Sequence, residues 1–96
     1  MNKPNVAKDK QLLLDAIKKA KNAGELPDFL DDLLTEEEIL DLAQRLKIAK
    51  LIIAGKTYDE IAEKVKTSTA TITKIGQVIK YGKGGLVKVF PKSKAS

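Results

Sequence analysis

The chain has 96 residues, of which 43% are hydrophobic and 32% are charged, and its net charge is +5. This length and composition suit one globular domain and exclude both a second independent core and a disordered chain. The chain contains no cysteine and no histidine. This excludes disulfides, thiolate nucleophiles, imidazole bases and the usual zinc ligands. With no bilayer-length apolar run and no secretory signal at the start, we expect a cytoplasmic protein without a membrane partner.

Charge is distributed unevenly along the chain. Residues 25–45 carry eight acidic side chains and one arginine, whereas residues 67–96 carry six lysines and no acidic residue. A segment of one charge sign can concentrate its field on a polyanion such as DNA. A solvated basic tail is the other interpretation, and it applies best to residues 88–94.

The first predicted helix covers Asp9–Ala23 and is amphipathic, with lysines on its polar side. Gly24 ends it. Pro27 suits the first turn of a short helical segment that follows. The apolar positions of these two segments are Leu12, Leu13, Ala16, Ile17, Ala20, Phe29, Leu30, Leu33 and Leu34.

A long helix is predicted from Thr35 to about Ala54, with Gly55 after it. Thr35 and Glu38 have the spacing of a capping box. One face consists of Ile39, Leu42, Leu46, Ala49 and Ile53, and it is broadened by Leu40, Ile48, Leu51 and Ile52. Because so much apolar surface exceeds the need of a small monomer, we expect burial from several sides, including by a second subunit.

Two further capped helices predict a helix-turn-helix. Thr57 and Glu60 form a second capping box before YDEIAEKV, and Ser68 caps the pattern TATITKIGQVIKYG, which ends at Gly82. A steep crossing needs small residues at the contact, and Ala62 and Gly76 suit that role. In a helix-turn-helix the second helix lies in the DNA major groove.

The exposed side of this second helix is rich in threonine, a poor helix former, so its composition calls for a functional reason. Small hydroxyl and methyl groups can approach base edges, and lysines can neutralise phosphates. We expect Thr69, Ala70 and Thr73 to read the DNA site. The full set of candidate DNA-binding residues is Lys56, Lys64, Lys66, Ser68, Thr69, Ala70, Thr71, Thr73, Lys74, Gln77 and Lys80.

The stretch from Leu26 to Gly85 resembles the Trp repressor superfamily, and within it the YerC/YecD-like branch. The shared motifs are the DDL-x-T opening, LAQRL, AGKTYDEIAEKV, STATITK and YGKGG. The resemblance implies an all-α fold in which two chains intertwine into one homodimer core. It also implies transcriptional regulation by paired reading heads that enter successive major grooves about 34 Å apart. Thr69, Ala70 and Thr73 fall where this family meets base edges or adjacent phosphates.

The co-repressor site of the family carries over only in part. Leu34, Thr35 and Arg45 match the residue types that contact tryptophan in the Trp repressor. Lys74, however, stands where an arginine stacks on the indole, Ile75 where a glycine makes room, and Val78 where a serine contacts the amino group. Since an isoleucine side chain would fill the space that the ligand needs, we do not expect tryptophan to act as a co-repressor.

These observations predict three segments: an N-terminal helical arm (1–24), a Trp-repressor-like helix-turn-helix domain (25–82) and a basic tail (83–96). The tail, KGGLVKVFPKSKAS, is expected to be irregular, and its role is open between phosphate contacts and packing of LVKVF on a partner subunit. The predicted function is a sequence-specific DNA-binding regulator, most simply a repressor, that acts as a homodimer on double-stranded DNA. We expect no catalysis, cofactor or metal. The alternative is a helical protein–protein interaction module, in which the threonine-rich helix docks on another protein.

Overall fold

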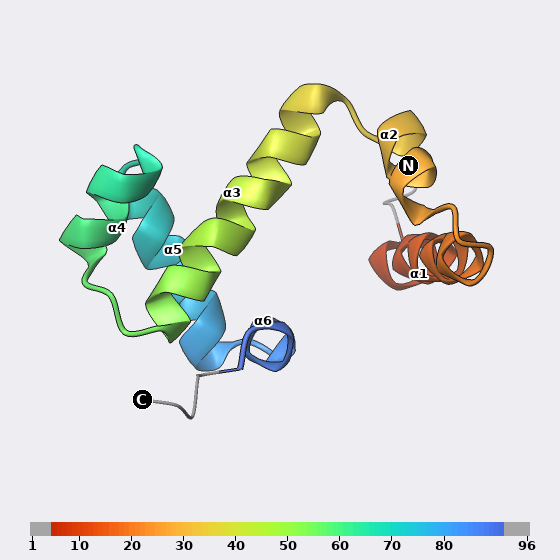
Figure 1. The fold of residues 1–96 in the computed structure, drawn as a ribbon. Coiled ribbons are helices and arrows are strands. Elements are labelled where there is room, and N and C mark those ends of the chain that lie inside the picture. The colour runs from red at the N-terminus through yellow and green to blue at the C-terminus, as the bar shows by residue number, and fades with distance from the viewer. Residues whose placement is uncertain (1–4, 92–96) are drawn as a thin grey trace, which may run out of the picture. The chain divides into compact units, whose positions relative to one another are not determined.

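The computed structural model describes residues 5–91, and all regular secondary structure in this range is helical. The prediction of an all-α fold is therefore confirmed. The chain divides into two compact units, Met1–Glu38 and Ile39–Ser96. Within the described range, no helix is both long and apolar enough to cross a membrane. The helices are α1 (Val6–Asn22), α2 (Leu26–Leu33), α3 (Glu36–Ile53), α4 (Tyr58–Val65), α5 (Thr69–Tyr81) and α6 (Gly85–Val89) (Figure 1).

In the first unit, α1 and α2 pack against each other. The side-chain oxygen of Asn5 accepts a hydrogen bond from the backbone N–H of Lys8 at 3.1 Å, so α1 begins at Val6 rather than at the predicted Asp9. Gly24 adopts the left-handed conformation (φ +73°) and turns the chain into α2. Neither helix contains a buried residue. The half-buried apolar residues are Ala16, Ile17, Ala20, Leu26, Phe29 and Leu30.

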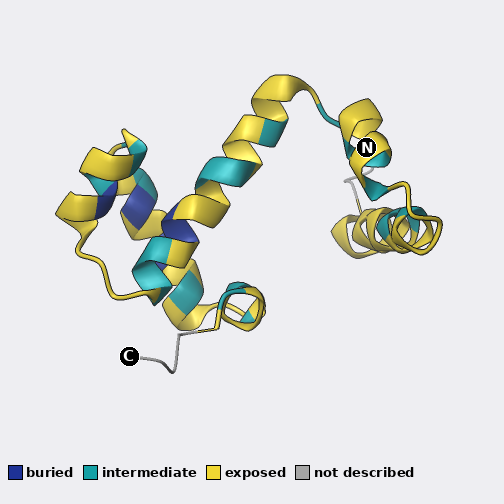
Figure 2. Ribbon diagram, viewed as in Figure 1, coloured by how far each residue is buried: buried dark blue, intermediate teal, exposed yellow. Residues whose placement is uncertain are grey.

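The core of the second unit forms where α3, α4 and α5 meet (Figure 2). Burying each of these large apolar side chains stabilises the fold by roughly 1.5–3 kcal/mol. The core is small, as expected for a unit of this size. Its buried members are Ile48, Ala49, Ile61, Ile72 and Ile75, and Leu51, Ile52, Ala62, Val65, Ile79 and Leu86 pack around them.

Within a single chain, the predicted apolar surface of the long helix α3 is only partly buried. Of the expected face, only Ala49 is buried in this chain, together with its neighbour Ile48. Leu42 and Leu46 remain 49% and 43% exposed. Apolar residues occur on several sides of this helix. Which of these sides contacts α4 and α5 depends on tertiary packing and cannot be read from the helix sequence alone.

Both predicted capping boxes are present. The Thr35 backbone N–H donates to the Glu38 carboxylate at 2.9 Å, and the Glu38 backbone N–H donates to the Thr35 hydroxyl at 3.1 Å. The pair Thr57 and Glu60 makes the same two bonds at 2.9 and 3.1 Å. These bonds satisfy amides that have no partner within the helix, so α3 and α4 begin where the sequence predicted.

The segment after Gly82 was expected to be irregular, but part of it is helical. Gly84 adopts the left-handed conformation (φ +82°), and the chain then forms the short helix α6. Leu86 packs against the core of the second unit, and this contact explains why the segment folds back as a helical turn. The alternation of apolar and polar residues in LVKVF was too short to distinguish a helical turn from an irregular segment. The predicted tail beyond Pro91 lies outside the described residues.

Candidate nucleic-acid interface

α4 and α5 form the predicted helix-turn-helix pair and pack against each other. Lys66 ends α4 in the left-handed conformation (φ 60°, ψ 49°), and its N–H donates to the Ala62 carbonyl at 2.9 Å. Gly76 is buried opposite α4, where an added Cβ would collide with the hydroxyl of Tyr58. The prediction that Gly76 allows a close approach is confirmed, although its neighbour is Tyr58 while Ala62 packs on the core.

α5 has two distinct sides. Ile72, Ile75 and Gly76 are buried on one side. The other side contains six of the predicted DNA-binding residues, and all of them are exposed. At about 100° per residue they cover one half of the helix surface. α5 carries no acidic residue. The exposed set is Thr69, Ala70, Thr73, Lys74, Gln77 and Lys80.

Ser68 and Thr71 are engaged with each other at the start of α5. The Ser68 hydroxyl oxygen accepts a hydrogen bond from the Thr71 backbone N–H at 3.2 Å, and the two hydroxyl oxygens lie 3.1 Å apart. Thr71 is half-buried. Ser68 and Thr71 therefore cap the start of α5. The first turn of α5, at the positive end of the helix dipole, contains no acidic residue.

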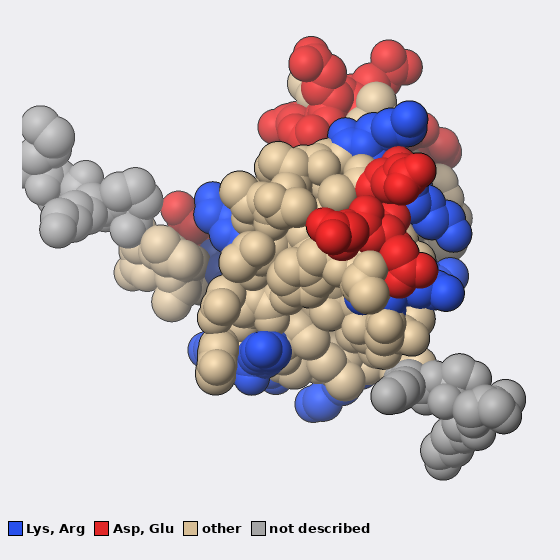
Figure 3. All heavy atoms as spheres, turned by 90° about the vertical axis from the view of Figure 1, so that its left-hand side faces the viewer, with Lys and Arg blue, Asp and Glu red and all other residues tan. Residues whose placement is uncertain are grey.

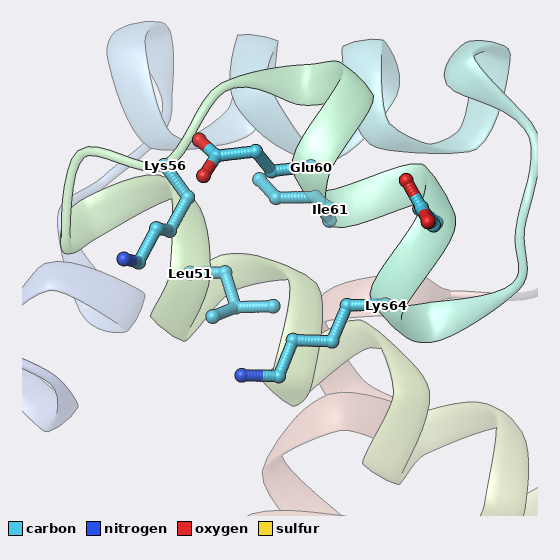
Figure 4. A pocket seen from close by; sticks show the side chains of 6 residues that line it. Leu51, Lys56, Glu60, Ile61 and Lys64 are labelled. Atoms are coloured by element: carbon cyan, nitrogen blue, oxygen red, sulfur yellow. The ribbon is translucent and has the colours of Figure 1, made fainter.

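The predicted phosphate-binding lysines do not form one group. Lys66 is exposed in the turn before α5. Lys56 and Lys64 line a cavity of about 370 Å³ between α3 and α4, together with Glu60 and Glu63. Figure 4 shows Leu51 between the side chains of Lys56 and Lys64, with the Glu60 carboxylate on the side of Lys56. The surroundings of Lys56 and Lys64 are therefore mixed in charge, because two carboxylates line the same cavity.

The carboxylate of Glu60 serves the helix start. The backbone N–H of Thr57 above all, then the Thr57 hydroxyl and the charge of Lys56, lower the pKa of Glu60 below its ordinary value. Glu60 therefore carries its negative charge at the positive end of the α4 dipole. Figure 3 shows acidic and basic side chains side by side on one part of the face that it draws, next to a wide uncharged area.

Two further cavities lie in the second unit, one mainly apolar and one of mixed character. One cavity of about 410 Å³ is lined by Leu42, Arg45, Leu46, Ile75, Val78 and Leu86. A second, of about 720 Å³, runs along α3 and the end of α4 and was missed by the sequence analysis. The sequence signal for it was limited to Leu40 and Leu51, two apolar residues at helical spacing outside the expected face. Within residues 5–91, no cluster of acidic side chains is arranged to hold a metal ion.

The comparison with known families decides where this fold belongs. The family model described as Trp repressor protein matches residues 8–94, which is nearly the whole chain. The chain belongs to the Trp repressor family.

Individual relatives agree with this assignment. A Trp-repressor-like ("TrpR like") protein from Eubacterium eligens, known from its crystal structure, is 37% identical and superposes with a TM-score of 0.78. That comparison covers 91% of this chain and 94% of the other. The Bacillus subtilis protein YerC, described as uncharacterized, is 39% identical over 75 residues, which are 78% of this chain and 72% of YerC. The resemblance to the Trp repressor family and its YerC-like branch is thereby confirmed.

Proposed function

We propose that this member of the Trp repressor family is a transcription regulator that reads the DNA major groove with α5 and acts as a homodimer. The observation that carries the proposal is the exposed side of α5. From Thr69 to Lys80 it is covered by small hydroxyl, methyl, amide and lysine side chains, contains no carboxylate, and is not used in the packing of its own chain. A duplex can therefore dock there without displacing any part of the core.

Each exposed group has a role in this proposal. Thr69, Ala70 and Thr73 lie in the first turns of α5. Their small side chains allow the helix start to approach base edges, and their methyl groups can contact thymine methyls. Lys66, Lys74 and Lys80 neutralise phosphates and fix the register of the helix on the duplex. Lys56 and Lys64 contribute less, because Glu60 and Glu63 share their cavity.

A second copy of the chain is the proposed partner on the apolar side of α3. Leu42, Leu46 and the 54%-exposed Val78 line one cavity, and neighbouring exposed apolar side chains of this kind suit coverage by a partner. Covering it with a second chain creates two reading heads. Two heads about 34 Å apart would contact successive major grooves, and occupation of such a site within a promoter would repress transcription.

The decisive experiment selects bound fragments from random DNA with the purified protein. We expect two half-sites separated by one helical turn. If a dimer neutralises about 6–10 phosphates, its affinity falls roughly 10³–10⁵-fold between 50 and 200 mM salt. A reporter gene with the selected site in its promoter is expected to lose expression when the protein is present. Absence of any DNA binding at low salt would overturn the proposal.

Control by tryptophan is not part of this proposal. The Ile75 side chain is packed in the core, at the position where the family has a glycine beside the ligand. We therefore expect saturating tryptophan to leave the affinity for the selected site unchanged. Tighter DNA binding in its presence would contradict this expectation and would direct attention to the cavity around Arg45 and Ile75.

A further inference from the structure

Gln77 is the only amide side chain of α5, and it lies in the middle of the exposed side of that helix. At about 100° per residue it points within roughly 20° of the direction of Ala70 and about 160° away from Ile75 and Ile79, which pack in or against the core. In the part of the chain that the structure describes, no hydrogen bond engages the amide of Gln77. This amide is therefore available to a partner outside the chain.

The exposed side of α5 contains one stripe of residues with the spacing i, i+3, i+4 and i+7. The stripe consists of Ala70, Thr73, Lys74 and Gln77. A helix that lies along the major groove meets base edges with residues at this spacing, because they face the same way over two turns. From Ala70 to Gln77 the stripe is about 10.5 Å long, at 1.5 Å per residue, and the major groove is about 12 Å wide. A helix that places Ala70 against base edges therefore has room for Gln77 in the same groove.

Two lysines border Gln77 on the surface of α5. Lys74 precedes it by three residues and Lys80 follows it by three, so they lie about 60° to either side of its direction. Both lysines are exposed. Cations suit the phosphates that border the groove, whereas the space between the two phosphate chains is occupied by base edges. Gln77 thus has the central position, where contacts to bases rather than to phosphates are made.

The amide of a glutamine matches one base in particular. It offers a donor, the NH₂ group, beside an acceptor, the carbonyl oxygen. In the major groove, adenine presents an acceptor at N7 beside a donor at the N6 amino group. Guanine presents two acceptors, cytosine a donor alone, and thymine an acceptor beside a methyl group. Adenine is therefore the base that can exchange two hydrogen bonds with one glutamine amide.

We infer that Gln77 reads an adenine in each half-site of the DNA. Its NH₂ group donates to N7, and its carbonyl oxygen accepts from the N6 amino group. This role rests on the proposed function of α5 and adds to it an A·T pair at a fixed place in each half-site. It makes Gln77 a residue that determines specificity, alongside the threonine and alanine side chains that precede it on α5.

Selection of bound fragments from random DNA with three forms of the full chain tests this role. With the unmodified protein we expect an adenine at one position of each half-site, preferred roughly 5–150-fold in affinity over the other bases. With Gln77→Ala the preference at that position should disappear while the other positions keep theirs. With Gln77→Arg the same position should change from adenine to guanine, because a guanidinium donates to both O6 and N7 of guanine.

Two controls separate base reading from charge. Gln11→Arg makes the same substitution at an exposed glutamine of α1 and should leave the selected sequence unchanged. Lys74→Ala should weaken binding to all sequences alike and reduce the slope of log affinity against log salt by about 1, as expected for a phosphate contact. Circular dichroism should show the same helical content for all four variants.

The adenine contact is overturned if Gln77→Ala keeps every base preference of the unmodified protein, or if it weakens binding to all sequences equally, as Lys74→Ala does. It is also overturned if Gln77→Arg retains adenine at the selected position. In each of these cases the unmodified protein still binds its selected site, so the proposed function stands. Absence of binding by the unmodified protein would overturn both.

Discussion

The two helices of the helix-turn-helix begin in similar ways but present different surfaces. In α4, the Thr57 cap is paired with the carboxylate of Glu60, and Asp59 adds a second acid to the first turn. In α5, the Ser68 cap is paired with Thr71, and the first turn contains no acid. The same local device thus stabilises both helices, while only one of them neutralises its positive end with its own carboxylate.

This difference bears on which helix is suited to an anion. The positive end of the α4 dipole is occupied by Glu60, and the rest of that helix mixes acids with lysines. The start of α5 is left without a negative partner and is followed by Lys74 and Lys80 on its exposed side. Backbone amides and dipole at a helix start favour a phosphate. The comparison therefore supports the proposal that α5, rather than α4, is the helix that contacts DNA.

The largest expected effect comes from giving α5 the carboxylate that it lacks. Ala70→Glu places a negative charge on the exposed side of α5, against the phosphates and base edges of the duplex. Like-charge contact at an interface costs several kcal/mol, so we expect specific DNA affinity to fall about 100-fold or more. Fluorescence anisotropy with a labelled operator fragment measures this loss.

The matched control is Ala7→Glu, which makes the same change at an exposed alanine of α1. It should leave DNA affinity within about twofold. Circular dichroism should show that Ala70→Glu retains its helical content and thermal transition. If that variant unfolds instead, Ala70 is part of the packing, and the exposed side of α5 has been assigned incorrectly.

The next effect concerns the contact that holds the two helices together. Gly76→Ala introduces a Cβ against the Tyr58 hydroxyl, and overpacking of this kind costs about 1–3 kcal/mol of unfolding free energy. Gly85→Ala is the control, because an added Cβ there meets no atom within 4 Å. Urea denaturation compares the two variants. Equal stability would mean that Tyr58 moves aside freely and does not fix the crossing of α4 and α5.

Removal of the two caps should separate stability from DNA binding. Thr57→Ala and Ser68→Ala each remove an N-cap oxygen and should each destabilise the fold by about 1 kcal/mol. Only Ser68→Ala alters the start of α5, so we expect the larger loss of DNA affinity there. Equal losses of affinity, measured where both variants remain folded, would show that the two helix starts contribute alike.

The smallest expected effect is a difference in acid stability. The pKa of Glu60 is lowered in the folded chain, so its cap contributes fully above the ordinary value of 4.5 and is lost as the pH falls through the folded value. In thermal melts, Glu60→Gln should therefore lose less stability than the unmodified chain between pH 5 and acid. Glu63→Gln removes a carboxylate from the same helix outside the cap and should follow the unmodified chain. If the melting temperatures of all three chains fell in parallel with pH, Glu60 would have no role in capping.

The helix starts and the exposed side of α5 could be predicted because their signals are local. Thr35 with Glu38, Thr57 with Glu60, and Ser68 each act on amides within three residues of themselves. The exposed threonines and lysines alternate with isoleucines at the period of a helix. Such patterns are visible in a single sequence because they do not depend on which other helix packs nearby.

Features that depend on tertiary packing could not be predicted in the same way. α3 has apolar residues on several sides, and only the arrival of α4 and α5 selects Ile48 and Ala49 for the core. α6 forms because Leu86 packs against the core of the second unit. The glycines and the alternating residues of this segment had favoured an irregular conformation. Lys56 and Lys64 carry the charge expected for phosphate binding, but the fold places Glu60 and Glu63 in the same cavity.

The position of Tyr58 against Gly76 allows the helix-turn-helix unit to be followed by its intrinsic tyrosine fluorescence. The chain has two tyrosines and no tryptophan, and both tyrosines, Tyr58 and Tyr81, belong to the second unit. Tyr81 is 78% exposed, whereas Tyr58 is 37% exposed and its hydroxyl lies against Gly76 of the neighbouring helix. Changes in tyrosine emission on titration with DNA would therefore report on this unit alone, and a single tryptophan introduced into α1 would report separately on the first unit.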